Sequence, residues 1–114
     1  MVASKTELFN KELQQQAALF KALAHPARLQ ILHYLAETKT CISGNLSDVL
    51  PLGRTTVNQH LRELKNAGLI HGHISGVNTN YCLNYEKIND MKMLFKDFLS
   101  EFKFTNESHC NINQ

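Results

Sequence analysis

Apolar residues recur at helical spacing through the first third of this 114-residue chain. Thr6 to Ala24 is predicted to form one helix, whose apolar stripe comprises Leu8, Phe9, Leu13, Ala17, Phe20 and Leu23. His25-Pro26 ends this helix, because proline disfavours a helical conformation in the residue before it. Pro26 itself suits the first turn of a second helix, expected to run to about Glu37. The apolar residues of that second helix include Leu29, Ile31, Leu32 and Leu35.

The middle of the chain predicts two further helices around a tight turn. Ser43 to Leu50 is expected to form a short third helix, and Pro51 to Gly53 the turn. Arg54 to Ala67 follows as a fourth helix, closed by Gly68 in a left-handed conformation. The pattern therefore predicts a helix-turn-helix.

The two sides of the fourth predicted helix differ in chemistry. Its apolar stripe, at i, i+4 and i+7, consists of Val57, Leu61 and Leu64. The other side carries polar and basic residues, with His60 beside them: Arg54, Thr55, Thr56, Asn58, Gln59, Arg62 and Lys65. Asn and Gln can bond adenine, Arg can bond guanine, and the Thr methyl can pack on the thymine methyl. The helix is therefore predicted to bind double-stranded DNA through the major groove.

Two strands are predicted after that helix, at Leu69 to Ile74 and at Thr79 to Asn84. Gly and Asn in the turn between them supply the backbone conformations that a hairpin needs. An isolated hairpin of two strands is only marginally stable, so this one is expected to pack against the helices. Its candidate contacts to DNA phosphates are His73, Asn78 and Asn80.

A last helix is predicted from Glu86 to Phe104. Its apolar residues alternate steps of three and four, at Ile88, Met91, Phe95, Phe98 and Phe102. Two interpretations remain open: the helix packs on the core of its own chain, or it pairs with a second copy of the chain. We favour the second, because so many aromatic side chains would crowd a terminal helix.

Composition and charge restrict the function classes further. The length suits one domain, and 43% hydrophobic and 19% charged residues are typical of a soluble globular protein. The net charge is only +2, and the segment 53–85 carries all of it: Arg54, Arg62 and Lys65 against Glu63. With no long apolar run and no secretory leader, we expect a cytoplasmic protein without a membrane partner.

The chain has three cysteines, at positions 41, 82 and 110. They are sparse and odd in number, which does not suit a disulfide framework, so free thiols are expected. None has a neighbouring His or Asp in a catalytic pattern, and no Gly-rich phosphate loop occurs, so we expect no enzyme activity. Cys41 is the candidate effector thiol, because it directly precedes the third predicted helix. The alternative is that Cys41 is only a small packing residue.

The segments described above resemble the ArsR/SmtB family of bacterial repressors. The resemblance rests on FKALAHPARLQILHYLAE (20–37), LPLGRTTVNQHLRELKNAGLI (50–70) and the wing sequence GHISGVNTNYCLN, and it covers about residues 15–100. It implies a mainly α winged helix-turn-helix with a small β-hairpin, in the order α-α-α-α-β-β-α. Residues 1–114 would form one domain, with the helix-turn-helix at about 43–67, the wing at about 69–84 and a dimerisation helix at about 86–104.

The resemblance also implies a function. Such a protein would be a homodimer, joined through its first and last helices, that binds a palindromic operator and represses transcription. The interface residues would be Leu13, Phe20, Ile88, Met91, Phe95, Phe98 and Phe102. An inducer, often a thiophilic metal or metalloid ion, would weaken DNA binding. For this chain, the candidates are a thiol-binding metal and an oxidant that acts on Cys41. The alternative is a winged-helix module that binds proteins and has neither DNA nor an inducer as a ligand.

The metal-sensing branches of that family are matched only in part. The arsenic-sensing branch has a Cys-x-Cys pattern at the third helix, whereas this chain has Cys41-Ile42-Ser43, so Cys82 or Cys110 would have to complete a metal site at Cys41. The zinc-sensing branch needs a histidine where this chain has Lys92, so no zinc site is expected on the last helix. No cofactor is certain from the sequence.

Overall fold

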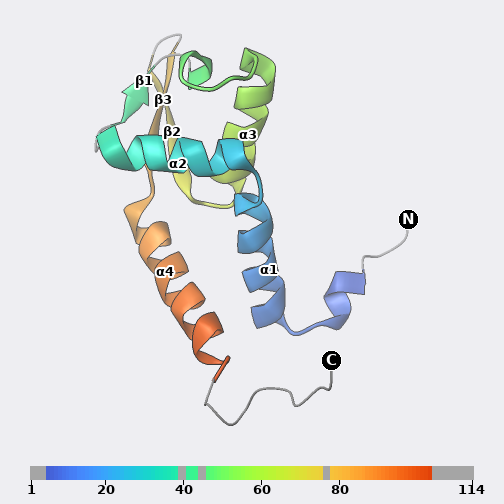
Figure 1. The fold of residues 1–114 in the computed structure, drawn as a ribbon. Helices are drawn as coiled ribbons and strands as arrows, with labels where there is room; N and C mark the ends of the chain where they lie inside the picture. Colours follow the sequence, from blue (N-terminus) through green and yellow to red (C-terminus); the bar gives the residue numbers. More distant parts are fainter. Residues whose placement is uncertain (1–4, 39–40, 44–45, 76–77, 104–114) are drawn as a thin grey trace, which may run out of the picture.

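Most of the protein is helical, with one small sheet. The computed structural model describes residues 5–38, 41–43, 46–75 and 78–103. In chain order, the elements are η1 (Lys5–Leu8), α1 (Lys11–Leu23), α2 (Pro26–Thr38), β1 (Ile42–Ser43), η2 (Leu46–Asp48), α3 (Arg54–Asn66), β2 (Ile70–Ser75), β3 (Asn78–Leu83) and α4 (Tyr85–Ser100). The body of the molecule consists of α2, α3 and the sheet, and α1 and α4 extend away from it (Figure 1).

The core lies where α2, α3 and the sheet meet. Its largest fully buried side chains are Ile31, Leu35, Val57, Leu64, Leu69 and Ile70. Val57, Leu61 and Leu64 are at most 3% exposed, which confirms the predicted inner stripe of α3. This stripe determines which side of α3 faces away from the protein.

A three-stranded sheet extends the predicted hairpin. β2 and β3 pair from Ile70 opposite Leu83 to Ser75 opposite Asn78, which confirms the predicted hairpin to within a residue or two. The strand order is β1-β3-β2, all antiparallel, and β1 pairs Ile42 with Tyr81. The sequence did not predict β1, because a strand of two residues is too short to show a periodic pattern.

The predicted third helix, Ser43 to Leu50, was wrong in extent. Only Leu46–Asp48 is helical, as a single 3-10 turn, and Ser43 belongs to β1. Pro51 disfavours a helical conformation at Leu50, and pairing with β3 draws Ser43 into the sheet. The two leucines at 46 and 50 are nevertheless buried, so this short segment still packs on the core.

The predicted first helix is interrupted. η1 ends at Leu8, and α1 begins only at Lys11, because Asn10 caps it: Asn10 Oδ1 accepts a hydrogen bond from the Leu13 backbone N–H at 2.8 Å. The predicted apolar stripe is also not the buried face of α1. The buried residues are Gln16, Leu19 and Ala22, whereas Leu8, Phe9, Leu13 and Phe20 are 82%, 62%, 48% and 38% exposed. Apolar side chains of α1 and of the segment just before it therefore stay open to solvent.

The end of α3, the sheet and the start of α4 meet at Gly68 and Asn84. Gly68 has φ of 81°, which confirms the predicted left-handed cap. Asn84 Nδ2 donates to the Gly68 carbonyl oxygen at 2.9 Å, and Asn84 Oδ1 accepts from the Lys87 backbone N–H at 3.2 Å. One side chain thus caps α4 and holds it to the end of α3.

Within the described ranges, no helix is both long and apolar enough to cross a membrane.

Candidate DNA-binding interface

The outer side of α3 is polar and open to solvent. The residues that the sequence assigned to DNA contact and that the structure leaves exposed on this helix are Arg54, Thr55, Thr56, Asn58, Gln59, Arg62 and Lys65. They share one helix whose opposite side is held in the core. We call this set the α3 outer face. A helix presented in this way can enter the major groove and place its polar side chains against base edges.

The start of α3 adds a feature that the sequence analysis missed. Gly53 occupies the N-cap position and offers no side-chain hydrogen bond, and the first turn contains no acidic residue. The first N–H groups of a helix have no partner within it, and they carry the positive end of the helix dipole. The start of α3 is therefore suited to a DNA phosphate. The signal available in the sequence was a glycine where Ser, Thr or Asp is the usual cap.

His60 lies apart from the α3 outer face. Its side chain is 8% exposed, its Nδ1 accepts a hydrogen bond from Arg28 Nε at 3.1 Å, and its ring lies 4.2 Å from the ring of His25. Burial lowers the pKa of His60, and electrostatic interactions with His25 and with the Arg28 guanidinium lower it further. The sequence grouped His60 with the DNA-contacting residues, whereas the structure places it on the inner side of α3.

The wing strands β2 and β3 present few side chains to DNA. His73 is exposed on β2, opposite Asn80 on β3. Asn80 is half-buried, and its Oδ1 is buried without a hydrogen-bond partner among the described residues, so this oxygen does not face a phosphate. Asn78 begins β3, but its side chain lies outside what the structure describes. His73 is therefore the predicted wing contact whose side chain is open to solvent.

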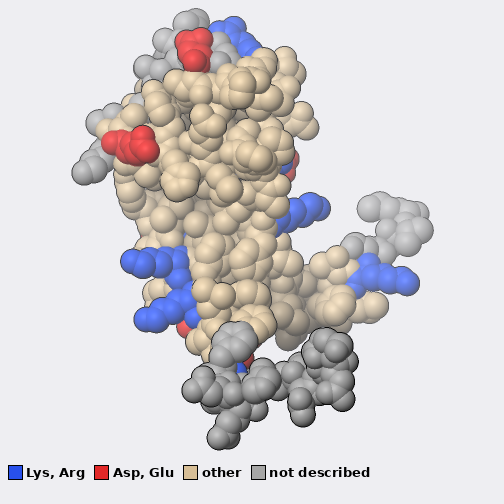
Figure 2. All heavy atoms as spheres, in the orientation of Figure 1, with Lys and Arg blue, Asp and Glu red and all other residues tan. Residues whose placement is uncertain are grey.

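Lys65 supplies a positive charge beside the wing. A Cβ atom at Gly72 would lie 3.4 Å from Lys65 Nζ, so this ammonium group reaches from the end of α3 to the middle of β2. On the face of the molecule seen in Figure 2, Lys and Arg are scattered and form no broad patch over α2. Lys65 therefore adds one basic group of α3 to the surface beside the wing.

A second surface joins α1 to α4. Phe20 stacks on Phe95 with ring centroids 4.8 Å apart and meets the edge of Phe98 at 5.1 Å. Ile88 and Met91 pack against the core of the same chain. Several large apolar residues of these two helices and of the segment after α4 remain exposed: Leu13 (48%), Met93 (60%), Leu99 (64%) and Phe102 (52%). Part of the predicted dimer interface therefore packs within one chain, and part is open.

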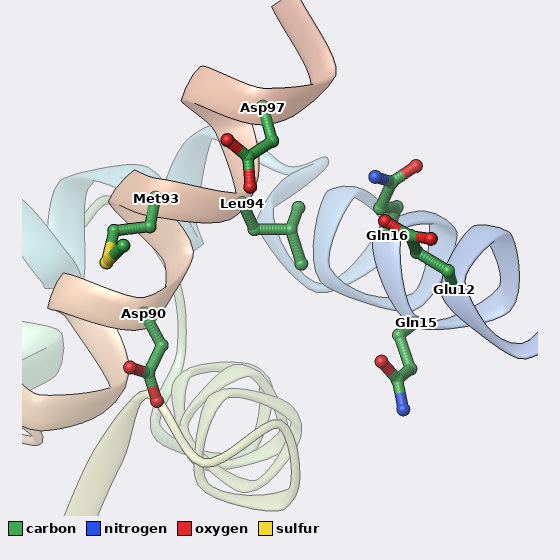
Figure 3. A pocket seen from close by; sticks show the side chains of 7 residues that line it. All are labelled: Glu12, Gln15, Gln16, Asp90, Met93, Leu94 and Asp97. Atoms are coloured by element: carbon green, nitrogen blue, oxygen red, sulfur yellow. The ribbon is translucent and has the colours of Figure 1, made fainter.

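A groove of about 390 Å³ lies between α1 and α4 (Figure 3). Its lining residues are Glu12, Gln15, Gln16, Asp90, Met93, Leu94 and Asp97. Carboxylates from both helices line this groove, and they repel phosphate. The groove is therefore not a part of the nucleic-acid interface.

The cysteines differ from the expectation of three free thiols. Cys41 and Cys82 form a disulfide, with their Cα atoms 4.3 Å apart, because β1 runs beside β3. Cys110 lies outside the described residues. Within the described part of the chain, no three His, Cys, Asp or Glu side chains are grouped so that they could hold a metal ion. Among the described residues, Cys41 and Cys82 supply the two sulfur atoms at this place, and an ion that takes three sulfur ligands would need a third from elsewhere.

Comparison with known proteins agrees with this geometry. Residues 23–73 match a family model described as "Helix-turn-helix domain". The arsenical resistance operon repressor of Bacillus subtilis (strain 168) is 32% identical over 111 residues, which span 96% of this chain and 99% of that repressor. The structure of HlyU from Vibrio cholerae N16961 has a TM-score of 0.61 at 29% identity and covers 80% of this chain and 99% of its own. An ArsR-like transcriptional regulator from Rhodococcus sp. RHA1 shares the fold, with a TM-score of 0.65 at 24% identity over 78% of this chain and 83% of its own.

Proposed function

Since this chain belongs to the ArsR/SmtB family of DNA-binding transcriptional repressors, we propose that it binds a palindromic operator as a homodimer. The members of this family are transcriptional regulators and not enzymes. The observation that carries the proposal is the α3 outer face, where seven polar or basic side chains are exposed on a helix whose other side is buried.

Roles within the α3 outer face follow from side-chain chemistry. Asn58 and Gln59 can each form two hydrogen bonds with an adenine edge, and Arg62 can do so with guanine. Arg54, at the start of the helix, and Lys65, at its end beside the wing, are placed to neutralise phosphates. We assign base reading to the amides and Arg62, and positioning to the two ends of the helix.

A dimer is proposed because one chain carries little charge. The net charge is +2, and affinity for DNA depends strongly on the number of phosphates that a protein neutralises. Two copies double those contacts and can occupy two half-sites about one helical turn apart. The exposed apolar residues of α1 and α4 support a dimer joined through these helices.

Release from the operator is proposed to depend on an effector that acts at Cys41. This residue is exposed and lies directly before β1, the strand that leads into η2 and α3. A change at this position is transmitted along the chain to the helix-turn-helix. Ser43 stands where the second sulfur of the Cys-x-Cys pattern of the arsenic-sensing branch would be, so Cys41 has no second thiol two residues further along the chain.

The test is an electrophoretic mobility shift with the DNA upstream of the protein's own gene. We expect a retarded complex, and we expect Gln59→Ala to weaken it by about 1–3 kcal/mol while changing the binding to random DNA much less. The matched control is Asn89→Ala, which removes an exposed amide from α4 and should leave both affinities unchanged.

Two outcomes would contradict the proposal. An equal loss of affinity on upstream and random DNA would show that Gln59 does not read bases. If neither DNA is retarded by the wild-type protein, the chain is better described as a winged-helix module that binds other proteins.

A further inference from the structure

Cys41 and Cys82 are brought together by the pairing of β1 with β3. The register that sets Ile42 opposite Tyr81 and Ser43 opposite Asn80 continues by one residue, so that Cys41 lies opposite Cys82. Directly opposed residues of an antiparallel pair point to the same side of the sheet. The two sulfur atoms are therefore placed to bond without any rearrangement of the fold, although 41 positions separate them in the sequence.

The proposed repressor function restricts the roles that the Cys41–Cys82 disulfide can have. A repressor acts where the DNA is, in a compartment that keeps thiols reduced, and disulfides there are usually transient and redox-sensing. The sheet is also stable without a covalent cross-link, because β2 and β3 form a ladder of six residue pairs and pack against the core. A permanent structural disulfide is therefore not expected between Cys41 and Cys82, because the compartment is reducing and the sheet is already held by strand pairing.

We propose that Cys41 and Cys82 form a reversible thiol–disulfide site, whose oxidation by a hydroperoxide lowers the affinity of the protein for its operator. This inference rests on the repressor function proposed above and names the effector class that acts there. Cys41 is exposed and Cys82 is half-buried, so Cys41 meets the oxidant and Cys82 completes the reaction from inside the sheet.

The reaction consumes one peroxide for each pair. The thiolate of Cys41 attacks one peroxide oxygen and the O–O bond breaks, which leaves a sulfenic acid on Cys41 and a hydroxide that takes up a proton to become water. The thiolate of Cys82 then attacks the Cys41 sulfur. The S–S bond forms, and the sulfenic oxygen leaves as a second water. Two thiols are oxidised, and the peroxide is reduced to two waters, or to an alcohol and a water for an organic peroxide.

The position of the bond connects this chemistry to DNA binding. β1 leads into η2 and α3, while β3 is the central strand of the sheet and pairs with β2 to form the wing. With the bond intact, the entrance of the helix-turn-helix is covalently fixed to the wing. With the bond reduced, only the pairs Ile42–Tyr81 and Ser43–Asn80 hold β1 to β3, so the two DNA-contacting parts can adjust separately as they enter adjacent grooves. The reduced protein is therefore the form that binds the operator more tightly.

The experiment compares reduced and peroxide-treated full-length protein in two independent measurements. Intact mass and thiol labelling report the chemistry: wild type should lose two hydrogen atoms and keep one labelled thiol of its three, at Cys110. Fluorescence anisotropy with operator DNA reports affinity: the Kd should rise by about 5- to 150-fold on oxidation and return with dithiothreitol.

Three serine variants identify the atoms involved. Cys41→Ser and Cys82→Ser should keep the affinity of the reduced protein after peroxide, whereas Cys110→Ser should respond as wild type does. Circular dichroism checks that each variant is folded. An unchanged Kd after complete formation of the Cys41–Cys82 bond would overturn the inference, as would loss of affinity by oxidised Cys82→Ser. If the reduced protein shows no operator binding while the disulfide still forms, the repressor proposal fails and the redox chemistry of the pair stands.

Discussion

At the scale of single residues, the contact between Arg28 and His60 connects three helices. Arg28, on α2, donates through Nε to His60 on α3 and through Nη1 to the Ala22 carbonyl oxygen at 3.2 Å on α1. The first bond requires that His60 Nδ1 keep its lone pair, so protonation at that nitrogen would break it. The lowered pKa of His60 agrees with this requirement, since burial and the electrostatic influence of His25 and Arg28 all favour the neutral ring.

Acidification is therefore expected to destabilise the fold through His60. The usual pKa of the imidazole is 6.5, and the folded protein lowers it, so below about pH 6.5 the unfolded chain binds a proton that the folded chain resists. The free energy of unfolding should fall as the pH drops from 6.5 toward the pKa of the folded state, although the charge on Glu63 opposes part of the shift. Urea unfolding at several pH values measures this.

The matched variants are His60→Asn and His33→Asn. The first keeps an acceptor near the position of Nδ1 but removes the titration, so its stability should vary less between pH 7 and pH 5. The second removes an exposed histidine of α2 and should keep the wild-type dependence. A wild-type slope in His60→Asn would assign the pH dependence to other groups.

At the scale of elements, the ends of helices determine how the recognition helix meets the wing. α3 ends at Asn66, Ala67 donates back into it, and Gly68 turns the chain left-handed into β2. A residue with a Cβ atom pays a steric cost in this conformation. Space around Gly68 does not exclude a larger residue, since the nearest atoms to an added Cβ would belong to the flexible Lys87 side chain, at 3.7 Å or more.

Gly68→Ala should destabilise the protein by about 1–2 kcal/mol, because of backbone strain alone. Gly53→Ser is the paired control. Gly53 has an ordinary negative φ of −71°, and a serine there could add the missing cap to α3, so its stability should stay equal or rise slightly. Thermal and urea unfolding of both variants provide the measurement. An unaffected Gly68→Ala would mean that the turn can adopt another conformation.

The elements also show where prediction from the sequence succeeds. The inner stripe of α3, the cap at Gly68 and the hairpin were predicted, because each depends on residues close together in the chain. β1, the disulfide and the burial of His60 were not, because each depends on a partner far away: Tyr81, Cys82 and Arg28. The apolar stripe of α1 was predicted, but which of its residues are buried was not, since periodicity shows that a face is apolar without showing what covers it.

At the scale of the whole molecule, α1 and α4 form a region with little core of its own. None of the residues of α4 is buried, although Ile88, Met91 and Leu94 pack against the edge of the core. Phe20, Phe95 and Phe98 hold the two helices together, and several large apolar residues around them face solvent. A second copy that covers this surface would bury it, which is the physical basis of the proposed homodimer.

Leu13→Asp should convert the dimer to a monomer without unfolding it. Leu13 is 48% exposed in the single chain and lies in the first turn of α1, where a carboxylate suits the helix dipole. Burying that carboxylate in a dimer interface would cost several kcal/mol. Sedimentation velocity measures the change, and Leu29→Asp, at a 45% exposed leucine of α2, is the control that should stay dimeric. A dimer of Leu13→Asp would place the interface elsewhere.

The stack of Phe20 on Phe95 joins the two ends of the chain, and this affects its synthesis. Phe20 leaves the ribosome about 75 residues before Phe95, a delay of roughly 4–15 s at ordinary rates of translation. During this time α1 has no α4 to pack against, and Leu13 of α1 and Phe9, just before this helix, are exposed. The amino-terminal helix is thus a natural binding site for chaperones while the rest of the chain is being made.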